Sequence, residues 1–466
     1  MYGHRTASAL TLLLCLGVVA AGTPAVAASP ADSPTVPAVG PAPADPVVAA
    51  LDRAAHPLRT VEAGGDTRDL RPLDHMIGDA RVVGLGEATH GSHDFFALKH
   101  RVFRRLVEEK GFRTFALEAP WSTGVLLDDY VVHGKGDPKR IMRDEFQNTY
   151  LWWNNTDYLR LVRWMRAYNI RHPDDPVRFL GNDIAWTGPE VYDAVGDHVA
   201  ATRPELSARL AELYRGLRPT VATGTYIEQY MSKPYAEREE MAARTGEALE
   251  LVRRLPPDGD RDAHDMAVRQ ATAIDRTARQ YAFDEKDPAQ VTAAMLYRSQ
   301  AMATNTLEWR ERTGTKVLVS AHNNHVGYRA EQPQWYPKVM GAFLRDALGK
   351  GYVSVGLSFD HGSFMATDQD ETAIYRWTLG PAGPGSNEWT LDRARPRDYV
   401  LDLRSVGSPA HEWLCQARTT RGIGTSYPDG PYDIALAEHY DVLVHLHDVE
   451  AARLRGRETA GDAPQR

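Results

Sequence analysis

Cysteine is nearly absent from this sequence of 466 residues, which contains only Cys15 and Cys415. Residues 1–27 have the features of a secretory signal peptide, because Arg5 precedes an apolar run from about 9 to 22 and small residues surround Ala27. We therefore expect a secreted protein that loses Cys15 on cleavage and has no internal disulfide. Its stability must come from a large apolar core, in which we expect Cys415 to be a buried, unreactive thiol.

Long apolar runs and clusters of basic residues are lacking too. The run in the signal peptide is short for a membrane span, and no later stretch is long and apolar enough for one. An uncleaved N-terminal anchor is the alternative to cleavage, whereas a lipid anchor is not expected because Cys15 lies inside the apolar run. The net charge is −8, so we expect neither a stable membrane association nor a nucleic-acid partner.

Several catalytic motifs are missing. No Gly-x-Ser-x-Gly is present, which argues against a serine triad of the α/β-hydrolase kind. The sequence has no His-Glu-x-x-His and no Gly-x-x-x-x-Gly-Lys-Ser/Thr, and Gly84-x-Gly86 lacks the third glycine of a dinucleotide site. We therefore expect no cofactor, and we look for chemistry in histidines, carboxylates and an arginine.

Composition and apolar periodicity divide the rest of the chain into five parts. Residues 28–50 and 456–466 are predicted to be a disordered linker and a disordered tail. Residues 51–188 and 293–455 form the two parts of an α/β core, and residues 189–292 form a helical insertion. Apolar strands separated by helices indicate a mostly parallel central sheet with helices on both faces. The main strands are predicted at 81–86, 114–117, 177–180, 316–320, 352–359, 399–403 and 440–445.

Polar side chains follow five of these strands, at the point where each apolar run ends. They are Glu87 and His90, then Glu118, Asp183, His322 and His325, and Asp360. Because the carboxyl ends of parallel strands meet at one edge of a sheet, we expect these groups to share a site. In such a site an imidazole can deprotonate water, a carboxylate can orient the imidazole, and a guanidinium can stabilise an oxyanion.

Each of these residues also has a structural interpretation. His90 could bond within its turn, and Arg298 could be only a buried ion-pair partner. His322 and His325 could join Glu87 and His90 in a zinc site. The remaining histidines without a catalytic constellation are interpreted as structural: His361, His411, His445 and His447.

A substrate wall is predicted from apolar residues near these groups. Met295 and Met302 flank Arg298 at helical spacing, so they share one face of the last helix before residue 313. Trp121, Trp152 and Trp153 follow the second strand in loop-like sequence. A cleft between the sheet edge and the insertion would then hold a bulky ester, although ordinary core packing is the alternative for these residues.

Six segments in order resemble the erythromycin esterase family. They read GLGEATHGS (84–92), GFRTFALEA (111–119), WMRAYN (164–169), RSQAMATN (298–305), AHNNHV (321–326) and SFDHGS (358–363). The resemblance implies an α/β core with a helical subdomain and a metal-independent esterase, whose reaction is the attack of water on the macrolactone of erythromycin-type antibiotics. The site residues it implies are Glu87, His90, Glu118, Arg298, and His322 or His325.

The chain departs from the family pattern at two places. His93-Asp94 stands where members often have an Arg-Glu pair, which bears on anion contacts. His361 stands where the family often has arginine after Asp360.

The sequence therefore predicts a secreted hydrolase that cleaves a carboxylic ester in a small molecule, with a macrolactone as a candidate substrate. The expected base is His322 or His325, oriented by Glu87 and Glu118, while His90 assists proton transfer and Arg298 stabilises the oxyanion. Two alternatives stay open: a metal-dependent hydrolase using the same histidines, and a non-catalytic secreted binding protein linked to extracellular polysaccharide.

Overall fold

The computed structural model describes residues 45–257, 260–456 and 459–463. The predicted signal peptide and most of the predicted linker lie outside these described residues. None of the helices in the described ranges combines the length and the apolarity that a membrane crossing requires.

The centre of the molecule is a nine-stranded sheet. Its parallel run has the order β11-β6-β2-β5-β3-β4, and β8 and β1 extend it in antiparallel fashion beyond β11. The parallel strands are β2 (Val82–Leu85), β3 (Phe112–Pro120), β4 (Arg178–Asp183), β5 (Lys316–Ser320), β6 (Tyr352–Thr367) and β11 (Val442–Val449). The antiparallel ones are β1 (His56–Pro57), β7 (Ile374–Leu379) and β8 (Tyr399–Asp402), and β9 (Arg418–Thr420) pairs with β10 (Tyr432–Ile434) separately.

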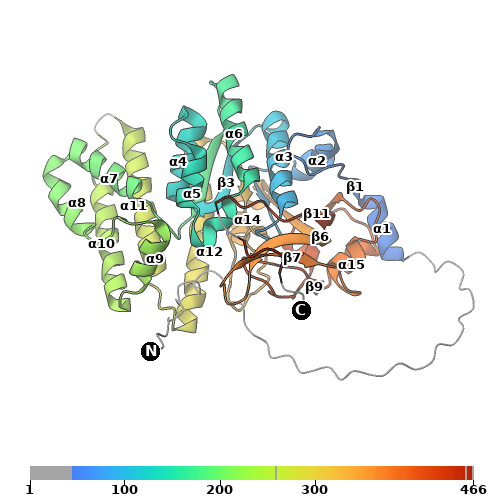
Figure 1. Ribbon diagram of the computed structural model, residues 1–466. Helices are drawn as coiled ribbons and strands as arrows, with labels where there is room; N and C mark the ends of the chain where they lie inside the picture. The colour runs from blue at the N-terminus through green and yellow to red at the C-terminus, as the bar shows by residue number, and fades with distance from the viewer. Residues whose placement is uncertain (1–44, 258–259, 457–458, 464–466) are drawn as a thin grey trace, which may run out of the picture.

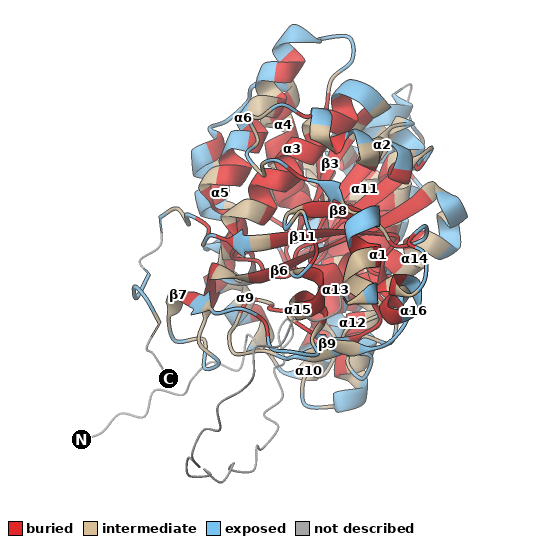
Figure 2. Ribbon diagram, turned by 90° about the vertical axis from the view of Figure 1, so that its right-hand side faces the viewer, coloured by how far each residue is buried: buried red, intermediate tan, exposed pale blue. Residues whose placement is uncertain are grey.

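Helices cover both faces of the sheet because successive strand residues point to opposite sides. Val83 and Leu318 belong to one apolar cluster, whereas their neighbours Val82 and Val317 belong to another. The first cluster includes residues of α2 (Arg71–Ile77), α3 (His93–Lys110) and α6 (Thr156–Arg171), and the second includes residues of α12 (Pro288–Thr313) and α14 (Met340–Leu348). Figure 1 shows the strands between these helices, and Figure 2 shows that the central strands are largely buried. The predicted class, a mostly parallel sheet with flanking helices, is confirmed.

Seven further helices complete the layers and the connections in the described ranges. They are α1 (Pro46–Ala54), α4 (Trp121–His133), α5 (Pro138–Glu145), α13 (Asn323–Val326), α15 (Asn387–Leu391), α16 (Ala410–Leu414) and α17 (Leu436–His439), with 3-10 turns at Arg68–Leu70, Asn148–Trp153, Pro204–Leu206 and Gly349–Gly351.

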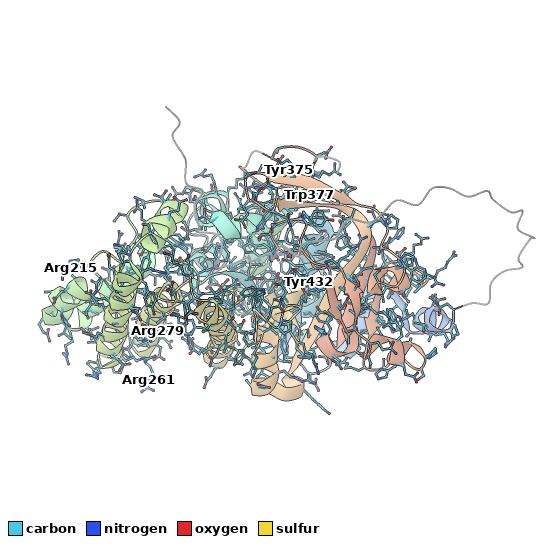
Figure 3. All side chains as sticks on the ribbon, turned by 90° about the horizontal axis from the view of Figure 1, so that it is seen from below. Arg215, Arg261, Arg279, Tyr375, Trp377 and Tyr432 are labelled. Carbon is cyan, nitrogen blue, oxygen red and sulfur yellow. The ribbon has the colours of Figure 1, made fainter. Side chains whose placement is uncertain are left out.

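A group of helices with its own apolar cluster stands between β4 and α12 in the sequence. It comprises α7 (Pro189–Thr202), α8 (Ser207–Leu213), α9 (Thr223–Met231), α10 (Tyr235–Arg253) and α11 (Arg261–Tyr281). The Thr277 hydroxyl in α11 donates to the Ile184 carbonyl at 2.8 Å, which ties the group to the end of β4. Figure 3 shows Arg215, Arg261 and Arg279 on this side of the molecule, apart from Tyr375 and Trp377 on β7.

The middle of β6 differs from the prediction. The strand was expected to end at residue 359, because the polar run 360–363 interrupts the apolar pattern. It continues to Thr367 because β11 and β7 satisfy its backbone on both sides. Asp360 is therefore a residue inside β6 and does not lie beyond a strand end.

Three further expectations are wrong at particular residues. The linker predicted over 28–50 gives way at residue 46 to α1, because Asp45 caps the helix and Leu51 is buried. The tail predicted to be disordered hydrogen-bonds to β7 through the backbone, for example from Ala460 N–H to the Ile374 carbonyl. Cys415 was expected to be buried but is exposed. It lies just past the end of the short helix α16, and Leu414 is the last buried residue of that helix.

Candidate active site

The ends of four neighbouring strands bring the predicted acid–base groups together. Glu87 and His90 follow β2, and His322 and His325 follow β5. Asp183 is the last residue of β4. Glu118 lies in β3, where the register with β4 shifts between Leu117 and Pro120, an irregularity of the kind that re-aims a side chain. All these side chains are buried.

Glycine at position 86 is required for the turn that presents Glu87. A Cβ atom there would lie 2.1 Å from Asn323 Oδ1. That oxygen accepts the Leu357 N–H at 3.1 Å, while the Asn323 Nδ2 donates to the Leu357 carbonyl at 2.7 Å. Asn323 thus fixes the loop after β5 against β6, and the sequence interpretation missed this role.

Glu87 and His90 form a buried carboxylate–imidazole pair. His90 Nδ1 lies 2.7 Å from Glu87 Oε1. Burial alone would raise the pKa of Glu87, but the Lys99 ammonium and His90 hold it below its usual value. Because an ionised carboxylate only accepts, it selects the tautomer of the neutral imidazole that has the proton on Nδ1 and the lone pair on Nε2. No described residue hydrogen-bonds to that Nε2.

Lys99 is a site residue that the sequence interpretation missed. It projects from α3, its side chain is fully buried, and its Nζ contacts the second oxygen of Glu87. It also donates to the Ala321 carbonyl at 3.3 Å. The signal was present, since Lys99 falls four residues after Phe95 and three before Val102 on a buried helix face.

Arg298 organises the second half of the site. Its Nε donates to Asp183 at 3.0 Å, and its NH2 donates to Glu118 Oε1 at 3.0 Å and also to Asp183. Its NH1 lies 3.4 Å from His325 Nε2. Asp183 also accepts from the Tyr150 hydroxyl at 2.8 Å. The Nε and NH2 groups of the guanidinium therefore already donate to carboxylates. NH1 is the group that could donate a hydrogen bond to a substrate oxygen.

Glu118 links Arg298 to both histidines after β5. Its Oε1 lies 3.1 Å from His325 Nε2, and its Oε2 accepts the His322 backbone N–H at 2.9 Å. Burial opposes ionisation, but His325, His90 and Arg298 together hold the pKa of Glu118 well below its usual value. A carboxylate is therefore kept charged inside the protein.

The two histidines after β5 differ in what they can do. The Nδ1 of His322 accepts the Asn324 N–H at 3.2 Å, and its Nε2 lies 3.2 Å from the Ile423 carbonyl, so both nitrogens are occupied. Burial and the neighbouring His90 lower the pKa of His322 to about 3. His325 Nδ1 is buried with no hydrogen-bond partner among the described residues. These contacts do not favour His322 as a base.

Of the aromatic and methionine residues expected to form a substrate wall, Trp153 lies against the site. Its ring is 4.9 Å from the His90 ring, edge to face, and its Nε1 donates to the Glu118 carbonyl at 2.7 Å. Trp121, Trp152 and Met302 are 5%, 1% and 0% exposed and pack in apolar clusters, which favours the core interpretation. Their place in a substrate wall stays a prediction. Met295 packs with Tyr336, whose ring contacts His325.

Asp360 does not join this network. It accepts from the Ala382 N–H at 3.0 Å and lies 2.9 Å from His361 Nδ1. Among the described residues, the group with the spacing of metal ligands is Asp360, His361 and His447, and the set of Glu87, His90, His322 and His325 is not such a group.

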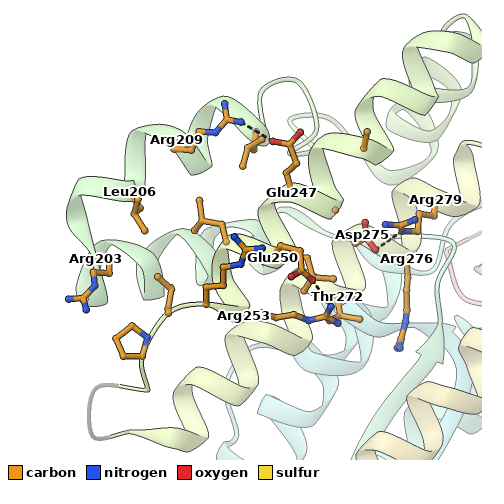
Figure 4. Close-up of a pocket in the computed structure, with 18 of the residues that line it drawn as sticks. Arg203, Leu206, Arg209, Glu247, Glu250, Arg253, Thr272, Asp275, Arg276 and Arg279 are labelled. Atoms are coloured by element: carbon orange, nitrogen blue, oxygen red, sulfur yellow. Dashed lines mark hydrogen bonds and ion pairs between the residues drawn. The ribbon is translucent and has the colours of Figure 1, made fainter.

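Two hollows bear on where a substrate fits. One hollow has a volume of about 490 Å³ and is lined by Tyr336, Glu331 and other residues of the segments 328–339 and 417–439. The Tyr336 ring also contacts the His325 ring, so this hollow lies near the site. The other, of about 1010 Å³, lies among α8, α10, α11 and α12 and is rich in arginine (Figure 4). None of the acid–base residues lines either hollow, and the first is connected to them only through the contact of Tyr336 with His325.

The fold and this network define the class of protein as a mixed α/β protein whose buried site has acid–base groups suited to hydrolysis. A model of the family described as erythromycin esterase matches residues 107–449. The chain belongs to the erythromycin esterase family.

Individual relatives agree with this assignment. The chain is 34% identical over 128 residues to "Erythromycin esterase type II" of Escherichia coli, a match that covers 26% of this chain and only 27% of that protein. It is 22% identical over 422 residues to "Putative hydrolase YbfO" of Bacillus subtilis (strain 168), covering 86% of this chain and 90% of that protein. Family and relatives identify the protein as a hydrolase.

Solved structures share the fold. A succinoglycan biosynthesis protein matches with a TM-score of 0.78 and 27% identity, covering 88% of this chain and 98% of that chain. A mutant of the erythromycin esterase EreC in its open conformation matches with a TM-score of 0.62 over 82% of this chain and 94% of that one. At 15% identity the second match concerns the fold alone.

Proposed function

We propose that this hydrolase cleaves a carboxylic ester with a water molecule that a histidine activates. The observation that carries the proposal is the Glu87–His90 pair, in which a 2.7 Å contact fixes the imidazole and leaves Nε2 without a partner among the described residues. A base of this kind typically contributes about 10²–10⁴-fold to a rate. The family membership supports an ester as the bond that is cleaved.

His90, rather than His322 or His325, is the base in this proposal. The His322 nitrogens are both engaged. His325 Nε2 faces Glu118 and Arg298, and its other nitrogen, Nδ1, is buried where an attacking water could not reach it. In the proposed reaction His90 Nε2 accepts a proton from water as the oxygen attacks the carbonyl carbon. Glu87 stabilises the imidazolium that forms, and Lys99 keeps Glu87 ionised. The same imidazolium then gives its proton to the leaving alcohol.

The oxyanion would meet the Arg298 NH1 group and, next to it, His325. Arg298 is preorganised by Asp183 and Glu118, so it needs little rearrangement when negative charge develops on the carbonyl oxygen. Loss of one such donor typically costs about 10²–10³-fold in rate.

The substrate is a small molecule in this proposal, with a macrolactone as one candidate. The 490 Å³ hollow beside Tyr336 is of a size that suits part of a bulky ester. Secretion, which follows from the N-terminal sequence alone, stays part of the proposal. N-terminal sequencing of protein from the culture medium tests it, and a mature start near residue 28 is expected.

A hydrolysis screen tests the function. Purified protein is incubated with 4-nitrophenyl esters, lactones and macrolides, and products are identified by mass spectrometry as substrate plus one water. Turnover that requires His90 supports the proposal. Activity that a chelator abolishes and zinc restores would favour the metal-dependent alternative. Binding of polysaccharide without hydrolysis of any ester would favour the binding-protein alternative.

A further inference from the structure

A second histidine cluster lies on β6 and β11, made of residues other than those of the catalytic network. His361 and His447 project from these neighbouring parallel strands, and their rings are 4.5 Å apart at 85°. Asp360 Oδ2 lies 2.9 Å from His361 Nδ1, and Asp392 Oδ1 lies 2.6 Å from His447 Nδ1. Each imidazole is thus oriented by its own carboxylate, while both rings remain partly exposed to solvent.

The contacts of His447 select one tautomer of its neutral ring. Asp392 only accepts, so it favours the tautomer with the proton on Nδ1 and the lone pair on Nε2. The Arg397 NH1 group, which can only donate, lies 2.6 Å from Nε2 and 3.3 Å from Nδ1. The Arg397 guanidinium therefore already donates a hydrogen bond to the lone pair of His447 Nε2. Histidines that bind metal ions usually donate their other N–H to a carboxylate in this way.

The spacing of the cluster suits a metal ion. One ligand atom from each of Asp360, His361 and His447 lies within 4.8 Å of the others. Tetrahedral bonds of about 2.0–2.2 Å to zinc place neighbouring ligand atoms about 3.3–3.6 Å apart. The three ligand side chains therefore need only small shifts once the Arg397 guanidinium has moved away from His447. A further carboxylate oxygen, from Asp448, lies 3.9 Å from His361 Nε2.

We propose that Asp360, His361 and His447 bind a divalent transition-metal ion of the zinc type. The ion takes the place of the Arg397 guanidinium at His447 Nε2. Two imidazoles and a carboxylate form a donor set that zinc accepts, with a fourth position left for water or Asp448. The ion joins β6 to β11 and stabilises the folded chain, because it binds a site that only the folded chain assembles.

Metal titration of the full chain tests this proposal. Protein without a polyhistidine tag is freed of metal with a chelator and titrated with Zn²⁺ by calorimetry, and with Co²⁺ by visible absorption. We expect one saturable site, and a melting temperature that rises on saturation. The variants His361→Ala and His447→Ala are each expected to weaken this binding at least tenfold.

The Arg397→Ala variant gives the sharper test, because it removes the competitor without removing a ligand. We expect it to bind zinc several-fold more tightly than the natural protein. The control is His411→Ala, since the His411 imidazole lies 3.7 Å from the Cys415 thiol and forms another exposed pair that could attract zinc. Unchanged affinity in His361→Ala and His447→Ala, absence of saturable binding, or binding lost only in His411→Ala would each overturn the proposal.

Discussion

Replacing Arg298 by methionine tests how the site holds its buried charges. Arg298 is 4% exposed, and its guanidinium donates to both Asp183 and Glu118. Methionine keeps the length and apolar packing of the side chain but leaves two buried carboxylates without that partner. Breaking a buried ion pair by removing one partner typically costs about 3–5 kcal/mol. Because folded domains are stable by only about 5–15 kcal/mol, the loss is large but the variant is expected to fold.

The pH dependence of this loss follows from Glu118. In the natural protein its lowered pKa contributes stability that is present above the ordinary value of 4.5 and is lost as the pH falls through the folded value. Arg298 is one of the charges that lower this pKa, so the variant keeps less of the contribution. The stability deficit of Arg298→Met is therefore full at neutral pH and shrinks as the pH falls below about 4.5.

Urea unfolding of both proteins at pH 7.5 and pH 4, followed by tryptophan fluorescence and circular dichroism, measures this difference. The control is Arg143→Met, which removes an exposed, solvent-screened pair with Asp144 and should leave the free energy of unfolding nearly unchanged at either pH. A deficit for Arg298→Met as small as that of the control, or one that grows towards pH 4, would refute this account of the network.

Three other substitutions separate packing, charge and binding. Lys99→Met should destabilise the protein by about 3–5 kcal/mol because it leaves Glu87 buried with one partner fewer, and adding Glu87→Gln should recover part of that loss in a double-mutant cycle of urea midpoints. If the stability loss of the double variant equals the sum of the losses of the two single variants, Lys99 and Glu87 do not interact. Trp152→Ala should lower stability by about 3–5 kcal/mol, since the ring is 1% exposed in the core, and a normal melting temperature with a raised KM would contradict that. Tyr336→Ala, with a confirmed ester substrate, should raise KM more than it lowers kcat, and an unchanged KM would place the substrate outside the 490 Å³ hollow.

The sheet could be predicted from the sequence because its parallel strands are uniformly apolar. The prediction for β5 gives the same residues, 316–320, as the structure. The same rule failed at β6, where the polar run 360–363 reads as a loop although β7 and β11 pair with it. Asp360 was therefore assigned to the wrong cluster, since a strand end cannot be located by polarity when two neighbours satisfy the backbone.

The choice of base could not be predicted, because it depends on contacts between distant segments. His322 Nε2 is occupied by the carbonyl of Ile423, a residue 101 positions away in a loop without a sequence signal. The Glu87–His90 pair, by contrast, is three residues apart and was recognised as part of the site. Lys99, like Arg298, is a buried charged residue among apolar residues of a helix. The same pattern that indicated Arg298 therefore also pointed to Lys99.

The most direct test of the central claim compares His90→Ala with His322→Ala on one ester that the natural protein hydrolyses. Circular dichroism and the melting temperature first establish that each variant is folded, and kcat and KM are then measured at a single pH. We predict that His90→Ala loses about 10²–10⁴-fold in kcat, because it lacks the acceptor for the water proton, and that His322→Ala loses less. Turnover by His90→Ala close to that of the natural protein would contradict the account.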